Sequence, residues 1–233
     1  ASARALAEAG SLVVLADRDG SAAKEAAAAL VSDGFQAHGY ALDVTNTAAV
    51  RDGAVELNER FGQVDILVAN AGIVRSGIKA EEMEDDDWRA VIDVNLNGVF
   101  WTCREFGRAM LARNAGTIVT IGSMSGDIVN RPQEQASYNA AKAGVHHLTR
   151  SLATEWASRG VRVNAVAPTY IDTPLTRFGL EDERLRSVWL DMTPMQRVGR
   201  PDEVASVVLF LASDASSLMT GSVVMADAGY SCW

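Results

Sequence analysis

The sequence has few cysteines and no excess of positive charge, and each shortage excludes whole classes of protein. Only two cysteines occur, Cys103 in an apolar helical pattern and Cys232 next to the last residue. Neither has a second cysteine or a histidine at metal-ligand spacing, so a disulfide framework and a zinc site are both poorly supported and no metal site is predicted. The net charge of −9 argues against nucleic acid and anionic membranes as partners.

Long apolar runs are also missing. No stretch approaches the ~20 apolar residues that a membrane-spanning helix needs, and no signal peptide is visible. A hydrophobic content of 48% and a charged content of 22% are typical of a soluble globular protein. We therefore expect a cytoplasmic protein whose 233 residues bury a core without covalent staples.

Short runs rich in Val, Ile and Leu alternate with helical patterns along the chain. This alternation is typical of βαβ units and predicts an α/β fold, a doubly wound, Rossmann-like parallel sheet with helices on both faces. No repeat or linker interrupts the pattern, so residues 1–233 are predicted to form one domain. The predicted strands are 12–16, 35–42, 65–70, 117–121, 161–166 and 222–225, and the predicted helices are 21–32, 46–61, 86–113, 137–158 and 201–213.

Tyr138 and Lys142 are the most informative pair in the chain. Residues four apart lie on one face of a helix, so the lysine ammonium can lie close to the phenol. A neighbouring cation favours the phenolate and lowers a tyrosine pKa from its usual value of about 10. The pair therefore predicts a general acid or base for a carbinol oxygen near neutral pH. The alternative is an ordinary amphipathic helix with a half-buried tyrosine.

Asp17 ends the first predicted strand and is followed by Arg18. In a dinucleotide-binding fold, an acid at this place hydrogen-bonds the ribose 2′-OH and repels a 2′-phosphate. Asp17 therefore favours NAD over NADP as the cofactor, and Arg18 weakens that preference. The alternative is that the aspartate only starts a turn.

Two further strands end in residues that suit a ligand site. Asp43-Val44 follows one of them, where the carboxylate either lies near the adenine or caps the next helix. Asn70-Ala71-Gly72 ends the other, and Gly72 lets backbone approach a ligand closely. Both lie at the carboxyl edge of the predicted sheet, where α/β proteins bind ligands.

These residues belong to a longer ordered constellation, namely Asp17, Asp43-Val44, Asn70-Ala71-Gly72, Asn95, Gly122-Ser123, Tyr138-x-x-x-Lys142 and Pro168. In this order and spacing the sequence resembles the short-chain dehydrogenase/reductase family, and the resemblance covers essentially the whole chain. It implies an NAD-dependent oxidoreductase that acts on CH–OH groups and assembles into a homotetramer or homodimer.

One part of the family pattern is missing before Asp17. Members of the family begin with a strand and a glycine-rich turn that binds the pyrophosphate at a helix N-terminus. The first residues of this chain match only the end of that first helix and the second strand. Either the chain is a fragment or the protein lacks this phosphate site. Because the loss would expose neighbouring strands and remove backbone donors, we interpret the domain as N-terminally incomplete.

Two serines compete for one catalytic position. Ser123 directly follows the glycine that ends a predicted strand, as the serine of the family does. Ser125 stands 13 residues before Tyr138, which is the spacing in many members. We favour Ser123, because the longer polar loop at 128–136 explains the extra two residues.

The resemblance also implies a mechanism. The Tyr138 phenolate takes the hydroxyl proton as hydride leaves for the nicotinamide, while Ser123 orients the oxygen. Lys142 lowers the tyrosine pKa and hydrogen-bonds the nicotinamide ribose, and Asn95 perturbs its helix and binds a water that continues the proton path. Asn is a poor helix former, so a role for its side chain is expected, and Asn97 is the rival.

The segment after residue 166 departs from the family at one position. Pro168 matches, but Thr169 stands where the family usually has glycine, and a β-branched side chain crowds whatever lies above it. Ile171 and Thr173 match positions that contact the nicotinamide carboxamide. The long connection 172–200 is the expected substrate loop, and its apolar side chains form a satellite hydrophobic cluster in the alternative interpretation.

Several segments are similar to bacterial galactitol and related polyol dehydrogenases, among them 123–133, 137–165 and 189–205. A sugar alcohol or another secondary alcohol is therefore the expected small-molecule substrate. Asn130 and Gln133 either hydrogen-bond a polyhydroxylated ligand or only satisfy the loop backbone.

Two other functions stay open from the sequence. One is a 3-oxoacyl-thioester reductase of the same family, although such NADP-preferring enzymes more often have basic residues at the place of Asp17. The other is a catalytically defective member that acts as an oligomer scaffold. For assembly we expect a second subunit to cover the long helices, whose apolar positions include Val99, Phe100, Leu148 and Leu152.

Overall fold

Strands and helices alternate along the whole chain, as the sequence predicted. The computed structural model describes residues 1–233, with strands Val13–Asp17 (β1), Ala37–Ala41 (β2), Ile66–Ala69 (β3), Gly116–Ile121 (β4), Val161–Pro168 (β5) and Val223–Ala226 (β6). The α-helices are Ser2–Glu8 (α1), Gly20–Ser32 (α2), Thr47–Phe61 (α3), Asp85–Ile92 (α4), Gly98–Arg113 (α5), Ala136–Trp156 (α6), Arg177–Glu181 (α7), Glu183–Asp191 (α8) and Pro201–Ala212 (α9).

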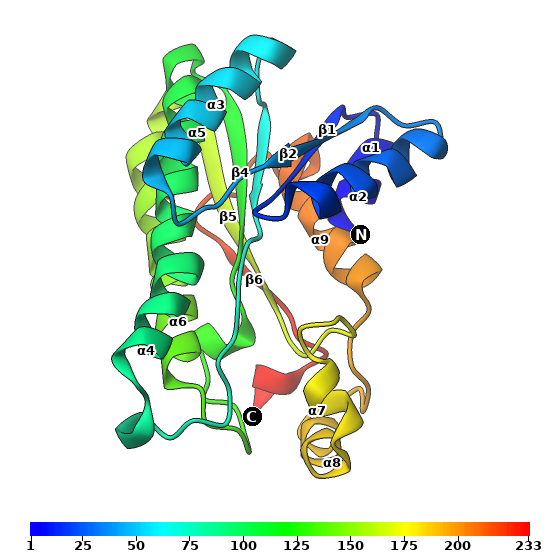
Figure 1. Ribbon diagram of the computed structural model, residues 1–233, viewed down its shortest axis with the longest axis vertical. Coiled ribbons are helices and arrows are strands. Elements are labelled where there is room, and N and C mark those ends of the chain that lie inside the picture. Colours follow the sequence, from blue (N-terminus) through cyan, green and yellow to red (C-terminus); the bar gives the residue numbers. More distant parts are fainter.

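The strands form two parallel sheets. β1 pairs with β2, and β3, β4, β5 and β6 follow one another in the second sheet. α3, α5 and α6 lie on one side of the larger sheet, and α9 with α1 lies on the other (Figure 1). The predicted α/β class, with parallel strands and helices on both faces, is confirmed, and the sheet is divided into two parts. The strand and glycine-rich turn that we expect ahead of residue 1 stay a prediction.

β4 and β5 form the centre of the fold. Runs of apolar and β-branched residues suit strands that are covered on both faces, and Ile118 and Val163 are fully buried. The core between this sheet and α3, α5 and α6 also contains Val99 and Leu152. Placing these two residues on a surface for a second subunit was wrong, because both pack inside their own chain. Phe100 keeps 37% of its surface exposed.

The predicted helix 86–113 is divided into three parts. α4 ends at Ile92, a π-helical turn covers Asp93–Asn97, and α5 begins at Gly98. Single π-helical turns inside helices are frequent at functional sites. Here the turn carries Asn95, one of the predicted catalytic residues, and that side chain is fully buried.

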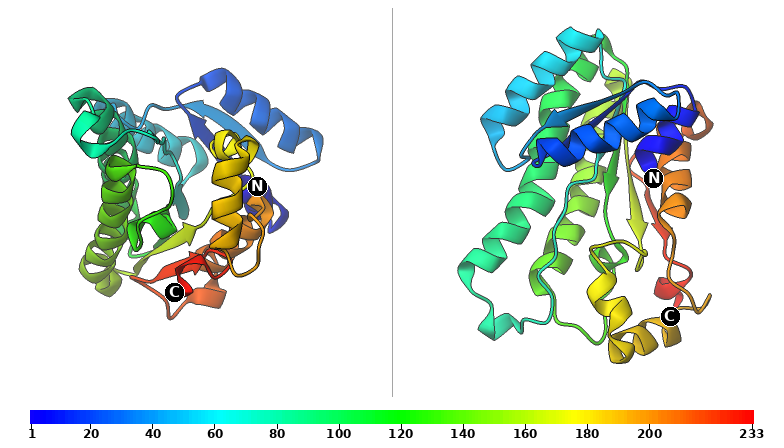
Figure 2. Two further views of the ribbon diagram at one scale, coloured as in Figure 1. Left: turned by 90° about the horizontal axis from the view of Figure 1, so that it is seen from below. Right: turned by 45° about the vertical axis from the view of Figure 1, so that its right-hand side comes forward.

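The carboxyl ends of β3 to β6 lie at one edge of the larger sheet, because these strands are parallel. α7 and α8 lie beyond this edge, near the C-terminus (Figures 1 and 2). Both helices belong to the connection 172–200, which therefore has secondary structure of its own. No helix in the chain is both long enough and apolar enough to span a membrane.

Candidate active site

Tyr138 and Lys142 lie in the first two turns of α6, as their spacing predicted. The Lys142 Nζ lies 5.5 Å from the centre of the Tyr138 ring. It donates a 2.8 Å hydrogen bond to the carbonyl of Ile121, the last residue of β4. Lys142 is only 3% exposed, so its ammonium is held between the helix and the edge of the sheet.

Burial changes the acidity of both groups. It lowers the pKa of Lys142 to about 8, because a buried ammonium loses its hydration. Burial also raises the pKa of the Tyr138 phenol, and a hydrogen bond with the Ser123 hydroxyl opposes that rise. The direction for Tyr138 is opposite to the one expected from Lys142 alone. The physical reason is that the phenol is desolvated while the ammonium is engaged by a backbone carbonyl.

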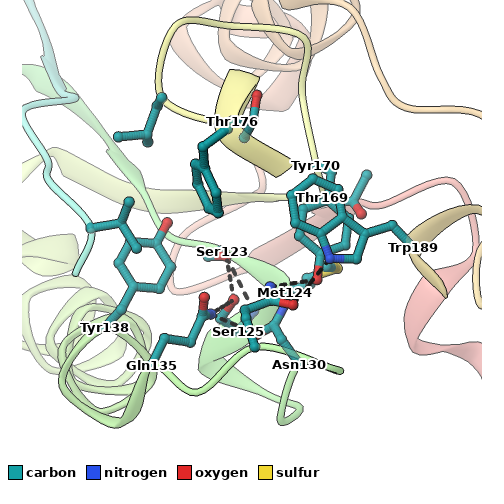
Figure 3. Close-up of a pocket in the computed structure, with 14 residues that line it drawn as sticks. Ser123, Met124, Ser125, Asn130, Gln135, Tyr138, Thr169, Tyr170, Thr176 and Trp189 are labelled. Atoms are coloured by element: carbon teal, nitrogen blue, oxygen red, sulfur yellow. Dashed lines mark hydrogen bonds between the residues drawn. The ribbon is translucent and has the colours of Figure 1, made fainter. Parts of the chain in front are cut away.

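Ser123 and Ser125 both face the pocket that Tyr138 borders (Figure 3). Ser123 follows β4 in extended backbone, and its Oγ accepts from the N–H of Ser125 at the start of the short 3₁₀ turn Met124–Gly126. Its hydroxyl also donates to the Ser125 Oγ at 3.0 Å. Of the two serines, only Ser123 acts on the acidity of Tyr138, which favours it as the partner of the phenol.

A buried network of amide and aromatic side chains forms the base of the pocket (Figure 3). The Tyr170 hydroxyl accepts hydrogen bonds from Asn130 at 3.0 Å and from Gln133 at 2.9 Å. The Trp189 indole N–H donates to Gln133 at 3.0 Å, and its ring stacks on Tyr170 with centroids 3.8 Å apart. Gln135 continues the network toward the serines. Asn130 and Gln133 therefore bind other side chains, not the loop backbone.

Asn95 joins the π-helical turn to the loop that follows β3. Its Oδ1 accepts from the N–H of Ile73 and its Nδ2 donates to the carbonyl of the same residue, both at 2.8 Å. Asn97, the rival in the sequence, donates to Asp93 within its own turn. Asn95 is thus the asparagine that the fold brings to the sheet edge.

The two aspartates on the cofactor side differ in their surroundings. Asp17 ends β1 in an exposed position, and one of its oxygens accepts from the N–H of Asp19 at 2.9 Å. The other oxygen has no hydrogen bond and is open to a ligand hydroxyl. Asp43 accepts from the backbone N–H and the hydroxyl of Thr45. The capping alternative for Asp43 is wrong, because the side chain that caps α3 is that of Asn46.

Asn70, Ala71 and Gly72 are exposed at the carboxyl end of β3. A Cβ atom on Gly72 would lie 3.8 Å from the Lys142 Nζ and 3.5 Å from the Asn95 Oδ1. The glycine therefore keeps open backbone beside a buried ammonium. This arrangement fits a cofactor with ribose and amide groups, which need donors and close backbone approach.

The remaining predicted cofactor residues are divided between two places. Val44 is half-buried after β2. Pro168 ends β5, and the hydroxyl of Thr169 behind it is buried without a hydrogen-bond partner while the residue lines the pocket. Ile171 and Thr173 follow in half-buried positions just before α7. The structure thus places Thr169 and Tyr170, directly after β5, on the pocket, whereas Pro168, Ile171 and Thr173 are not among the residues that line it.

Sequence reasoning did not single out Tyr170, Gln135 or the apolar side chains Val74, Leu175 and Phe178, all of which line the pocket. Tyr170 follows β5 directly, so the rule that ligands bind at strand ends would have found it. The apolar residues come from loops and from α7, where no local pattern distinguishes a pocket wall from an exposed surface.

A parallel α/β fold with a tyrosine, a serine and a buried lysine at its carboxyl edge defines a class of dinucleotide-dependent oxidoreductases. A family model described as enoyl-(acyl carrier protein) reductase matches residues 1–231. A galactitol 2-dehydrogenase of Rhizobium johnstonii is 55% identical over 230 residues, which cover 98% of this chain and 89% of that protein. The chain belongs to the short-chain dehydrogenase/reductase family.

A more distant relative and two solved structures agree with this family. A 3-oxoacyl-[acyl-carrier-protein] reductase of Salmonella typhimurium is 42% identical over 212 residues, covering 90% of this chain and 85% of that protein. The crystal structure of gox2181 has a TM-score of 0.99 and 56% identity, covering 100% of this chain and 90% of that one. A gluconate 5-dehydrogenase from Burkholderia cenocepacia, in complex with NADP and tartrate, has a TM-score of 0.95 and 37% identity, with coverage of 100% and 90%.

These similarities identify an oxidoreductase that acts on secondary alcohols or ketones and binds a nicotinamide dinucleotide. The fold and the class of reaction were both predicted from the sequence. The 3-oxoacyl-thioester alternative is the weaker of the two family functions, since its relative is less similar than the galactitol enzyme.

Proposed function

We propose that the protein oxidises a secondary alcohol group of a sugar alcohol or related polyol with NAD, and reduces the matching ketone in the other direction. The observation that carries this proposal is the placement of Tyr138 and Ser123 on one pocket, with Lys142 buried directly behind them. The similarity to a galactitol 2-dehydrogenase supports a polyol as the substrate.

Tyr138 is the proposed general acid and base. In oxidation the carbinol O–H bond breaks and its proton passes to the phenolate, while NAD, when bound, accepts the hydride from the carbinol carbon. Ser123 hydrogen-bonds the reacting oxygen and holds it toward the phenol. Lys142 supplies positive charge and a donor for a ribose hydroxyl, and Asn95 with a water returns protons to solvent.

The residues proposed to hold the cofactor lie at the carboxyl ends of four strands and, for Tyr138 and Lys142, on α6. The open oxygen of the carboxylate after β1 suits a ribose 2′-OH, and the exposed backbone after β3 suits close approach of a ribose. The two positions after β2 suit the adenine, and the segment after β5 suits the nicotinamide carboxamide. These residues are Asp17, Asp43, Val44, Asn70, Ala71, Gly72, Tyr138, Lys142, Pro168, Ile171 and Thr173.

The pocket has features that suit a polyol. The stacked rings of Tyr170 and Trp189 lie at the base of the pocket, where they supply apolar surroundings for the C–H groups of a carbohydrate chain. The amides of Asn130 and Gln133 have further N–H groups beyond those that bind Tyr170. These donors, together with the Ser125 hydroxyl, can bind several hydroxyl groups along one ligand.

Two measurements, made one after the other, test the proposal. The 233-residue chain is titrated with NADH, following energy transfer from its five tryptophans, and saturable binding is expected. A panel of hexitols, pentitols and simple secondary alcohols is then assayed with NAD, beside an acetoacetyl thioester with NADPH. Turnover of polyols supports the proposal, whereas turnover of the thioester alone contradicts it and supports the 3-oxoacyl-thioester function.

The acidity of the phenol predicts how the reaction responds to pH. Because burial raises the pKa of Tyr138, the neutral phenol is the main form near pH 7. We therefore expect kcat/KM for polyol oxidation to rise by about tenfold per pH unit between pH 6 and 8, since the base form grows in that proportion. Ketone reduction needs the phenol and should not show this rise. A flat oxidation profile would contradict the role of the phenolate.

Asp17→Ser is expected to erode the preference for NAD over NADP. The serine still caps the local turn but removes the charge that repels a 2′-phosphate, so the ratio of kcat/KM values should fall by about 10- to 100-fold, as for one charged hydrogen bond. Asp86→Ser, at an exposed position on α4, is the matched control. An unchanged cofactor ratio in the Asp17 variant would remove this residue from the ribose site.

We also propose that the protein forms a homotetramer or homodimer. Phe100 on α5 is 37% exposed and Leu148 on α6 is half-buried, so both leave apolar surface for a second copy. Light scattering after size-exclusion chromatography measures the assembly directly, and a monomer at micromolar concentration would contradict it.

A further inference from the structure

His146 lies on α6 one turn after Lys142 and is 1% exposed. Its Nδ1 lies 3.2 Å from an oxygen of Asp127, and its Nε2 accepts a 3.4 Å hydrogen bond from the backbone N–H of Ser123. The Asp127 side chain is 43% exposed at the end of the 3₁₀ turn. The imidazole therefore joins a carboxylate at the surface to the backbone of the serine at the pocket.

Two glycines make room for this ring. A Cβ atom on Gly122 would lie 2.3 Å from the His146 Nε2, and one on Gly126 would lie 2.6 Å from its Cε1. Both distances are too short for any side chain, so the turn that carries Ser123 can fold around the imidazole only with glycine at both places. The ring thus fills the space inside the turn and contacts it on both sides of the serine.

The two hydrogen bonds define which nitrogen of the His146 ring carries the proton. The carboxylate of Asp127 can only accept, so Nδ1 carries the proton and Nε2 keeps the lone pair that the Ser123 N–H needs. Burial lowers the pKa of His146, Asp127 opposes this, and the charges of Arg150 and Lys142 act with burial. The neutral ring is therefore the form at pH 7. A second proton, on Nε2, would leave the Ser123 N–H facing a donor.

We propose that the Asp127–His146 pair is a positioning device for Ser123, which fixes the backbone of that serine and so aims its hydroxyl at the reacting oxygen. His146 does not reach the pocket, and it acts only through the turn that it supports. The inference rests on the proposed function, because that function gives Ser123 its role. It adds the requirement that the imidazole be neutral, with its single N–H proton on Nδ1.

Two substitutions separate the contacts of the ring. His146→Gln can still place a carbonyl oxygen where Nε2 accepts, whereas His146→Asn reaches only the position of Nδ1. We expect His146→Asn to lower kcat for ketone reduction by about 10- to 100-fold, as misplaced catalytic groups do, with little change in KM for the cofactor. His146→Gln should stay within a few-fold of the wild-type kcat. His147→Gln, at the exposed neighbour on α6, is the control and should change nothing.

The pH profile of reduction supplies a readout that a purely structural role would not move. Reduction uses the Tyr138 phenol, which stays protonated at acid pH. A loss of kcat at acid pH, below the usual titration range of histidine, therefore reports protonation of His146. His146→Gln should remove this loss. Asp127→Asn keeps an acceptor for Nδ1 but removes the charge that favours the second proton, so the loss should move to lower pH. A His146→Asn variant with wild-type kcat and pH profile overturns the proposal.

A measurement without substrate separates this inference from the proposed function. The chain has three histidines, so selective ¹⁵N labelling of the imidazoles with the three single variants assigns the His146 ring. A proton on Nδ1 at pH 7, and a Ser123 amide resonance that shifts as this ring titrates, support the positioning role even if no polyol is turned over. A proton on Nε2, or a charged ring at pH 7, overturns it whatever the activity.

Discussion

Replacing Tyr138 by phenylalanine is expected to lower kcat for polyol oxidation by at least about 10³-fold, within the range that general acid–base catalysis contributes. The substitution keeps the ring, which is half-buried on α6, and removes only the hydroxyl that faces the pocket. Its hydrogen-bond partner is the Ser123 hydroxyl at the pocket, so the hydroxyl takes no part in the hydrophobic core. Turnover is followed by the absorbance of NADH, and assembly by light scattering of the same samples.

Tyr40→Phe is the control for this experiment. The Tyr40 hydroxyl donates to Glu56 at 2.7 Å, between β2 and α3 and outside the pocket, so its loss should leave kcat unchanged. If Tyr138→Phe kept more than a tenth of the wild-type kcat, the phenol would not be the acid or base. If it changed the oligomer as well, loss of structure would explain the lost activity.

The fold class could be predicted because the chain alternates two periodic patterns with clear breaks. Runs rich in valine and alanine such as Val161–Pro168, with only Arg162 and Asn164 as polar residues, favour strands that are covered on both faces, and parallel strands require helices between them. The same rule placed most of the site. Asp17, Asn70 and Ser123 were predicted from the ends of their strands together with the motifs of the resembling family, and each lies at or just beyond a strand end.

The rest depended on contacts between residues far apart in the sequence. The tie between Asn95 and Ile73 spans 22 positions, and that between Trp189 and Gln133 spans 56, so neither has a local signal. The pKa of Tyr138 was expected to fall because the sequence shows the neighbouring lysine. Desolvation is not visible in the sequence. In the structure it raises the pKa of Tyr138 and is the largest effect on that pKa.

Replacing Lys142 by methionine is expected to abolish turnover and, at the same time, to change how stability depends on pH. The Lys142 ammonium is buried, and its pKa falls from 10.5 to about 8. A depression of this size corresponds to about 3 kcal/mol of destabilisation of the folded state when the group is charged in both states. Methionine has a similar length and no charge, so it removes this penalty, while the Ile121 carbonyl loses its donor.

The sign of the pH effect follows from proton binding. Between pH 8 and 10.5 the unfolded chain holds the lysine proton and the folded chain has released it, so the stability of the wild type rises with pH. Below pH 8 both states are charged and the full penalty applies. The free energy of unfolding of the wild type, relative to Lys142→Met, should therefore increase by about 2–3 kcal/mol from pH 7 to pH 10.

Urea unfolding of both proteins at the two pH values measures this difference, with Lys24→Met at an exposed site on α2 as the control. When the two free energies of unfolding are subtracted, the contributions of groups that titrate alike in both proteins cancel. An inactive Lys142 variant that is as stable as the wild type at pH 7, and less stable at pH 10, would show that the ammonium serves the reaction and not the fold. A difference that does not change with pH would mean that the folded protein solvates this ammonium as well as water does, and the buried cation behind Tyr138 would lose its physical basis.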